Sequence, residues 1–144
     1  MVFFQVSWFT AALIGMFSFA CMALILKKLT YWLPTPIILL YLFTFTSALY
    51  LILGIKRGSQ LGISWQALGL LALASVFAFI GNLADIEALK LAPNPGYASA
   101  VKAGQILVIT FAALLLFPEQ KLSVQGMCGV LLVFFGVVML SLQR

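Results

Sequence analysis

The stretch GSQLGISWQALGLLALASVFAFIGNLA, residues 58–84, has no charged side chain over 27 positions. A bilayer hydrocarbon core about 30 Å thick is crossed by roughly 20 apolar residues in a helix. The stretch is therefore long enough to cross a membrane once and too short to cross it twice. Its apolar residues run continuously instead of alternating with polar ones, which predicts a helix and not a strand of a membrane barrel.

The same pattern recurs along the whole chain of 144 residues, of which 65% are hydrophobic and 8% charged. Globular domains carry about 25% charged residues, so a water-soluble domain is excluded. The predicted fold class is an all-α integral membrane protein, a bundle of about five transmembrane helices in a single domain over residues 1–144. The predicted spans are about 2–26, 34–55, 64–90, 96–117 and 122–142, with loops at 27–33, 56–64, 91–96 and 118–122. We expect the bilayer of a plasma or inner membrane as surroundings.

The polar composition narrows the classes of function. With no histidine and three acidic residues, the chain lacks the parts of metal sites and common catalytic groups, so neither an enzyme nor a cofactor is expected. The net charge of +5 comes mainly from residues at span ends, where they suit anionic headgroups, so nucleic acid is not an expected partner. Cys21 and Cys128 lie inside predicted spans and are interpreted as packing residues, not a disulfide. The N-terminal run is interpreted as a retained span, because it lacks a basic region and a cleavage site.

The basic residues divide almost evenly between the two sides of the predicted bundle. One side has Lys56, Arg57 and Lys121, and the other has Lys27, Lys28, Lys90 and Arg144. The positive-inside rule orients a protein by this difference, so a near tie predicts weak orientation and allows insertion both ways up. A single unit could then pair with an upside-down copy, which would give the inverted repeats of many transporters. The alternative is one orientation fixed by the insertion machinery or a partner.

Lys102 is the most informative residue, because it lies inside the fourth predicted span. A lysine at a span centre costs about 2.5–3.5 kcal/mol on insertion scales, which indicates a functional or paired residue. Asp85 in the third span and Lys102 both lie six residues, or about 9 Å, from the predicted helix ends at 91 and 96. This equal depth predicts an Asp85–Lys102 pair, or one that uses Glu87.

A second interpretation needs no buried pair. The long stem of Lys102 could carry its ammonium group to the headgroups, while Glu87 pairs with Lys90 three residues further along the same helix. The sequence leaves the two interpretations open.

Helical spacing gathers the other polar residues of the spans into stripes. The stripes are Ser75, Ala78, Asn82 and Asp85 in the third span, Ser99, Lys102, Ala103, Ile106 and Thr110 in the fourth, and Ser7, Ala11 and Ser18 in the first. Small residues also let membrane helices pack closely, which by itself explains the Ser, Thr and Ala positions. Close packing does not explain Asn82, Asp85 and Lys102, so only these three indicate a polar site. The candidate substrate-binding residues are Lys102, Asp85, Asn82, Ser99 and Gln105. Lys102 would favour an anionic or zwitterionic substrate, and Asn82, Ser99 and Gln105 would supply hydrogen bonds.

Two runs near the end of the chain resemble a known family. APNPGYASA at 92–100, followed by an apolar helix that ends at Glu119, and GVLLVFFGV at 129–137 resemble the second half of an EamA-type unit. That unit is the repeat of the drug/metabolite transporter superfamily, which also includes the small multidrug resistance transporters. The resemblance implies one half of a ten-helix inverted-repeat fold, working as an antiparallel homodimer or beside a sister subunit. Gly129 and Gly136 match the dimer-contact spacing of the small multidrug transporters.

The sequence departs from these relatives in two places. The first span has no glutamate, which the small multidrug transporters use for proton and cation exchange, so that coupling is not implied. Ile106 stands where many EamA-type units have a proline, so a kink at that point is not implied either.

The sequence therefore predicts a secondary carrier or exporter of a small metabolite or drug, acting as a dimer of inverted units. The alternative is a non-transporting accessory membrane subunit or a lipid-carrier translocation partner. Transport by the purified protein in liposomes separates the two.

Overall fold

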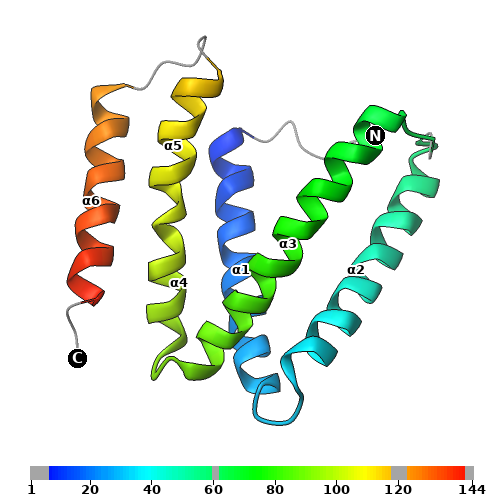
Figure 1. Ribbon diagram of the computed structural model, residues 1–144, viewed down its shortest axis with the longest axis horizontal. Coiled ribbons are helices and arrows are strands. Elements are labelled where there is room, and N and C mark those ends of the chain that lie inside the picture. Colours follow the sequence, from blue (N-terminus) through cyan, green and yellow to red (C-terminus); the bar gives the residue numbers. More distant parts are fainter. Residues whose placement is uncertain (1–6, 60–61, 118–122, 142–144) are drawn as a thin grey trace. The chain divides into compact units, whose positions relative to one another are not determined.

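The computed structural model describes residues 7–59, 62–117 and 123–141, and every element in these ranges is a helix. The helices in chain order are α1 (Trp8–Leu29), α2 (Thr35–Lys56), α3 (Trp65–Leu91), α4 (Pro95–Ala103), α5 (Gln105–Leu116) and α6 (Val124–Ser141) (Figure 1). The first three, and α4 with α5 together, are long and apolar enough to cross a membrane, and α6 contains a shorter apolar helix. The prediction of an all-helical chain with long apolar helices is confirmed.

The predicted loop at 27–33 was wrong at its start. α1 continues to Leu29, so Lys27 and Lys28 lie in its last helical turn. Cationic side chains are favourable there because the C-terminal end of a helix carries partial negative charge. Thr30 follows the helix and donates a hydrogen bond from its hydroxyl to the carbonyl oxygen of Lys27, at 2.7 Å. At the other end of α1, residues 2–6 of the predicted span lie outside the described residues.

The chain divides into two compact units, Met1–Leu91 and Ala92–Arg144, here called the N-terminal and C-terminal units. In the N-terminal unit, α3 packs against both α1 and α2. The buried apolar core of this unit is small, and its members are Leu26 of α1, Ile38 and Leu39 of α2, and Ile86 and Leu89 of α3. This core lies toward the end of the unit where α1 ends, α2 begins and α3 ends.

α2 begins in a way that its prolines explain. Pro34 caps the helix with an extended backbone, φ −65° and ψ 144°, and Pro36 lies in the first turn. A proline is tolerated there because the first N–H groups of a helix have no intrahelical acceptor. The buried Thr35 lies between these two prolines, so its side chain is held in place from the first turn of α2.

In the C-terminal unit, α6 packs against α4 and α5, and Val130 of α6 is buried. The fourth predicted span, 96–117, corresponds to α4 and α5 together, a 22-residue span from Pro95 to Leu116. Within it the sequence did not predict the one-residue interruption at Gly104. The backbone N–H of Gly104 donates to Val101 O at 3.0 Å, and that of Leu107 donates to Gly104 O at 3.1 Å. Both bonds span three residues, the pattern of a 3₁₀ turn inside a helix. Glycine weakens a helix, and this one makes the interruption without a proline at Ile106.

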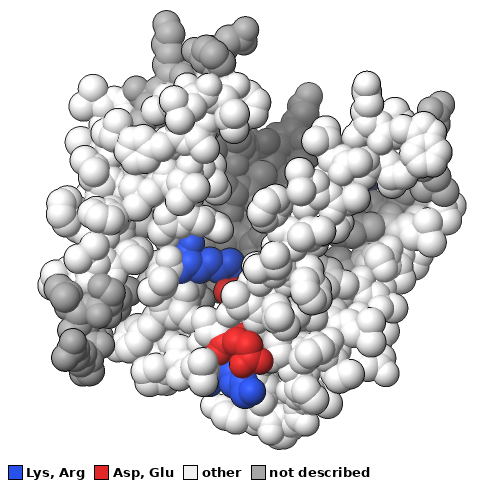
Figure 2. Space-filling view, in the orientation of Figure 1, with Lys and Arg blue, Asp and Glu red and all other residues white. Residues whose placement is uncertain are grey.

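The outward surfaces of the described helices are apolar. Trp65 is 87% exposed, Phe77 68% and Leu115 83%, and they represent a large set of exposed aromatic and aliphatic side chains. On the face drawn in Figure 2, charged groups occupy a small part of the surface. Helices that are apolar on all sides are typical of membrane spans, because in water such surfaces would associate.

Candidate functional site

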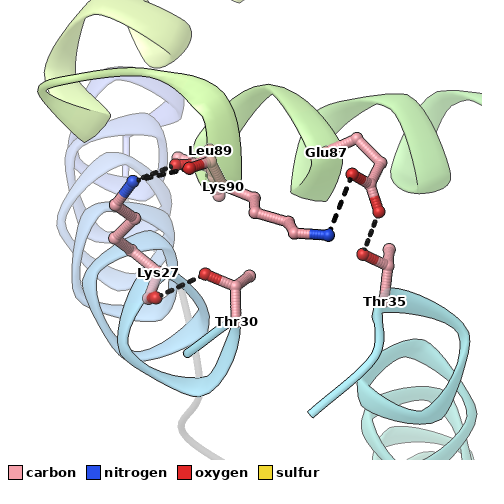
Figure 3. A network of polar contacts seen from close by, with 6 residues as sticks. All are labelled: Lys27, Thr30, Thr35, Glu87, Leu89 and Lys90. Carbon is pink, nitrogen blue, oxygen red and sulfur yellow. Dashed lines mark hydrogen bonds and ion pairs between the residues drawn. The ribbon is translucent and has the colours of Figure 1, made fainter. Parts of the chain in front are cut away.

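One end of the N-terminal unit carries a layer of polar contacts between its three helices (Figure 3). The Nζ of Lys27 donates hydrogen bonds to the carbonyl oxygens of Leu89, at 2.6 Å, and Lys90, at 3.1 Å. These carbonyls belong to the last turn of α3, where a helix has no backbone donors left to satisfy them. The lysine at the end of α1 therefore caps α3 and joins the two helices.

The second contact of this layer joins α2 to α3. The hydroxyl of Thr35 donates a hydrogen bond to Oε1 of Glu87. Lys90 Nζ lies 3.6 Å from the other carboxylate oxygen of Glu87. Thr35 is 3% exposed and is the buried polar residue among the described residues. The predicted pairing of Glu87 with Lys90 is confirmed, and the carboxylate has an additional partner on α2. The predicted path of Lys102 to the headgroups stays a prediction.

Aromatic rings lie beside the lysines of the same layer. Lys27 Nζ lies 5.9 Å from the ring centre of Tyr31, and Lys28 Nζ lies 5.7 Å from that of Trp32. Both rings are exposed and belong to the connection between α1 and α2. Such contacts between ammonium groups and aromatic faces add attraction, and tryptophan and lysine together are typical of a membrane–water interface. We call Lys27, Lys28, Thr35, Glu87 and Lys90 the polar end of the N-terminal unit.

The contact of Lys27 with the end of α3 was not predicted from the sequence. Consecutive spans run in opposite directions, so the ends of the first and third spans lie on the same side of a membrane. A lysine at the end of one is then near the unsatisfied carbonyls at the end of the other. This signal was present in the sequence, but which carbonyls the lysine reaches depends on how α1 packs against α3.

Two of the predicted substrate-binding residues, Asn82 and Asp85, lie in the N-terminal unit. They are one turn apart on α3 and both are half-buried. Asn82 donates a hydrogen bond from Nδ2 to the carbonyl oxygen of Ala78, at 2.7 Å. The predicted stripe on this helix is retained, because α3 is continuous from Trp65 to Leu91.

The other three predicted residues lie in the C-terminal unit. Ser99 and Lys102 are exposed and lie one turn apart on α4, and Gln105 is the first residue of α5. Lys102 and Gln105 therefore flank the helix interruption at Gly104. Because Asp85 and Lys102 belong to different units, their pairing stays a prediction.

Gly129 and Gly136 lie on α6 and were predicted as dimer contacts. A Cβ atom added at either glycine would meet no described atom within 4 Å. The two positions are seven residues apart and so share one face of the helix. That face has room for a neighbouring helix, and the dimer itself stays a prediction.

The N-terminal unit also has an apolar groove of about 590 Å³ between α2 and α3. Its lining residues are Pro36, Leu39, Leu40, Phe43, Thr44 and Ser47 of α2, with Phe79 and Leu83 of α3. This groove could not be predicted from the sequence, because hydropathy does not reveal where two apolar helix faces diverge. A volume of this size is within the range of small-molecule sites, roughly 300–1,000 Å³.

The fold places the chain in the class of helical proteins whose helices are long and apolar enough to cross a membrane. The N-terminal unit has polar contacts at one of its ends, and the C-terminal unit has polar side chains beside a helix interruption. Comparison with known protein families gives no match, and searches of curated proteins and of solved structures give no significant match.

Proposed function

We propose that this chain is an integral membrane carrier of a small anionic or zwitterionic metabolite that works as a pair of inverted units. The placement of the helices in a lipid bilayer is supported by the exposed apolar side chains on every described helix. It is also supported by the lengths of α1, α2, α3 and of α4 with α5, each sufficient to cross a membrane. In lipid, these surfaces need no partner protein to cover them.

The observation that carries the proposal is the interruption of the fourth span at Gly104. Interrupted membrane helices are typical of the binding sites of secondary carriers, which lie near the middle of the membrane. Lys102 lies two residues before the interruption and Gln105 one residue after it. An ionisable residue inside a span is expensive and therefore indicates function. Lys102 would attract the negative group of the substrate, and Gln105 and Ser99 would accept or donate hydrogen bonds.

In the N-terminal unit, Asn82 and Asp85 remain the candidate residues for substrate contact. They are polar, half-buried and one turn apart on α3. Asn82 already uses Nδ2 for a bond within its helix, so its side-chain oxygen is the atom that would receive a substrate donor.

Inverted pairing is supported by the distribution of charge. The contact between Lys27 and the last turn of α3 means that Lys27, Lys28 and Lys90 lie at one end of the N-terminal unit. Lys56 and Arg57 lie at the other end of α2. Three basic residues against two give a weak orientation signal, which allows both insertions. Reporters fused to the C-terminus should give signal on both sides of the membrane, and signal on one side alone would contradict inverted pairing.

The test of transport uses purified protein in liposomes, with a panel of anionic and zwitterionic metabolites assayed by charge movement or counterflow. Lys102→Gln should lower transport about tenfold or more, since hydrogen bonds to charged groups contribute about 1.5–3 kcal/mol. Lys56→Gln is the matched control, because Lys56 lies exposed in the last turn of α2, and it should transport at nearly the wild-type rate.

Two results would contradict the proposal. Normal transport by Lys102→Gln would remove Lys102 from the site. Failure of the folded wild-type protein to move any of the compounds would favour the accessory subunit instead.

A further inference from the structure

The α2–α3 groove has the length of one bilayer leaflet. On α2 its lining runs from Pro36 to Ser47, which at the helical rise of 1.5 Å per residue is about 16 Å. Half of a hydrocarbon core is about 15 Å thick. Because α2 extends from Thr35 to Lys56, the groove begins at the first turn of the helix and ends near its middle.

One end of the groove adjoins the polar end of the N-terminal unit. Pro36 directly follows Thr35, whose hydroxyl binds Glu87. On the opposite wall, Leu83 lies one helical turn before Glu87 on α3. The groove therefore passes from charged groups at a helix end to hydrocarbon at the helix middle, which is the polarity of a membrane lipid.

The wall of the groove offers almost no polar group to a ligand. The hydroxyl of Thr44 donates to the carbonyl oxygen of Leu40 at 2.7 Å, and that of Ser47 donates to the carbonyl oxygen of Thr44 at 2.9 Å. Both hydroxyl hydrogens are thus bonded within α2, and the remaining lining side chains are hydrocarbon. A ligand segment in this groove must itself be apolar, because a polar one would lose its hydrogen bonds.

The charge at the polar end favours a negative headgroup. In the described part of this end, three ammonium groups accompany one carboxylate, and that carboxylate already has Thr35 and Lys90 as partners. Lys28 is exposed, and the side chain of Lys90 is 50% exposed. Trp32, which lies beside Lys28, adds an exposed ring of the kind found at headgroup level. Basic residues in this position attract anionic lipids.

We propose that the α2–α3 groove is a binding site for one anionic glycerophospholipid. One acyl chain lies along the groove, and the phosphate lies at the level of Lys28 and Lys90. The site goes beyond the carrier function and does not depend on it, because a lipid can occupy the groove whether or not the chain transports a solute.

The headgroup, not the tail, decides which lipid binds. An acyl chain that leaves the bilayer for the groove exchanges one hydrocarbon surrounding for another and gains no hydrophobic transfer energy. An anionic headgroup near a surface lysine gains about fivefold in affinity for each lysine, since each such charge is worth about 1 kcal/mol. We therefore expect phosphatidylglycerol to bind at least fivefold more tightly than phosphatidylcholine of the same chain length.

The test is native mass spectrometry of the full chain, purified in detergent and titrated with these two lipids. The wild-type protein should retain one phosphatidylglycerol in preference to phosphatidylcholine. Lys28→Gln with Lys90→Gln should remove the preference, whereas Lys56→Gln, at the far end of α2, should keep it. Equal retention of the two lipids by the wild type would overturn the assignment of the headgroup.

The groove is tested with two filling substitutions and a control. Leu83→Trp places an indole in the groove and should abolish retention, and Leu49→Trp, on an exposed part of α2 outside the lining, should not. Ser47→Phe blocks only the far end, so it should reduce retention of long chains while short-chain phosphatidylglycerol still binds. Circular dichroism and size-exclusion profiles show whether each variant has folded. If Leu83→Trp fails to fold, the lipid retention of Ser47→Phe is the test of the groove. Long-chain retention unchanged in a folded filling variant would overturn the site, whatever the outcome of the transport assay.

Discussion

Thr35→Val is the most direct test of the polar end, because it removes one hydroxyl and keeps the shape of the side chain. Thr35 is 3% exposed and donates to the carboxylate of Glu87 from the first turn of α2. After the substitution, Oε1 of Glu87 loses its donor from α2, while the other carboxylate oxygen keeps its ion pair with Lys90.

The expected loss follows from the exposure of the two partners. A hydrogen bond to a charged group contributes about 1.5–3 kcal/mol, and more is lost when the remaining group is buried. The side chain of Glu87 is 42% exposed, so water can replace part of the lost bond. We therefore expect the lower end of that range, and a fall in the free energy of unfolding of about 1–2 kcal/mol.

The measurement is a double-mutant cycle of Thr35→Val and Glu87→Ala, with unfolding followed by circular dichroism in mixed micelles as the denaturing detergent is increased. The cycle isolates the pair, since the loss of the Lys90 contact cancels between its two sides. Thr44→Val is the matched control, because that hydroxyl donates to a carbonyl of its own helix and should cost less than about 0.5 kcal/mol. A coupling energy below about 0.5 kcal/mol between Thr35 and Glu87 would refute the reasoning, since contacting residues in one network usually couple by more.

Three further predictions concern the other contacts. Lys27→Met should lower the free energy of unfolding by about 1–3 kcal/mol, because two carbonyls at the end of α3 lose their donor. Lys28→Met is the control and should change the free energy of unfolding little. Equal effects of the two substitutions in the same micelle assay would contradict the capping role of Lys27. Gly136→Leu should leave the helix folded, since an added Cβ meets open space, but should shift the protein to monomers in cross-linking and light scattering if α6 forms the dimer contact. The Asp85–Lys102 pair predicted from the sequence is tested by Asp85→Lys and Lys102→Asp. Each substitution alone should lower expression and transport, and the double variant should recover both. An equal loss in the two single variants and the double variant would reject the pair.

The sequence predicted the helices well because their cause is local. A run of about 20 apolar residues has one stable form in lipid, with every backbone group bonded inside its own segment. The observed bounds of α2 and α3 therefore agree with the predicted spans to within one residue. The pairing of Glu87 with Lys90 was also predictable, since both lie on one helix three residues apart.

The errors occurred where a weak local signal competed with the apolar pattern. Lys27 and Lys28 were placed in a loop because charge was used to end the span, although cations are favourable in the last turn of a helix. The interruption of the fourth span was not predicted, because one glycine inside an apolar run is common in membrane helices. The backbone bonds around Gly104 reveal the 3₁₀ turn, and composition alone does not.

The length and apolar character of the helices came from the sequence by itself, because each depends on the free energy of one segment in its surroundings. The joining of α1, α2 and α3 through Lys27, Thr35 and Glu87, and the groove that opens beside this contact, were decided only by the tertiary structure. Residues more than 50 positions apart meet there, and whether they meet depends on the directions and crossing of whole helices. The sequences of helices that are apolar on all sides do not indicate how these helices pack, since any of their faces can lie against lipid or against another helix.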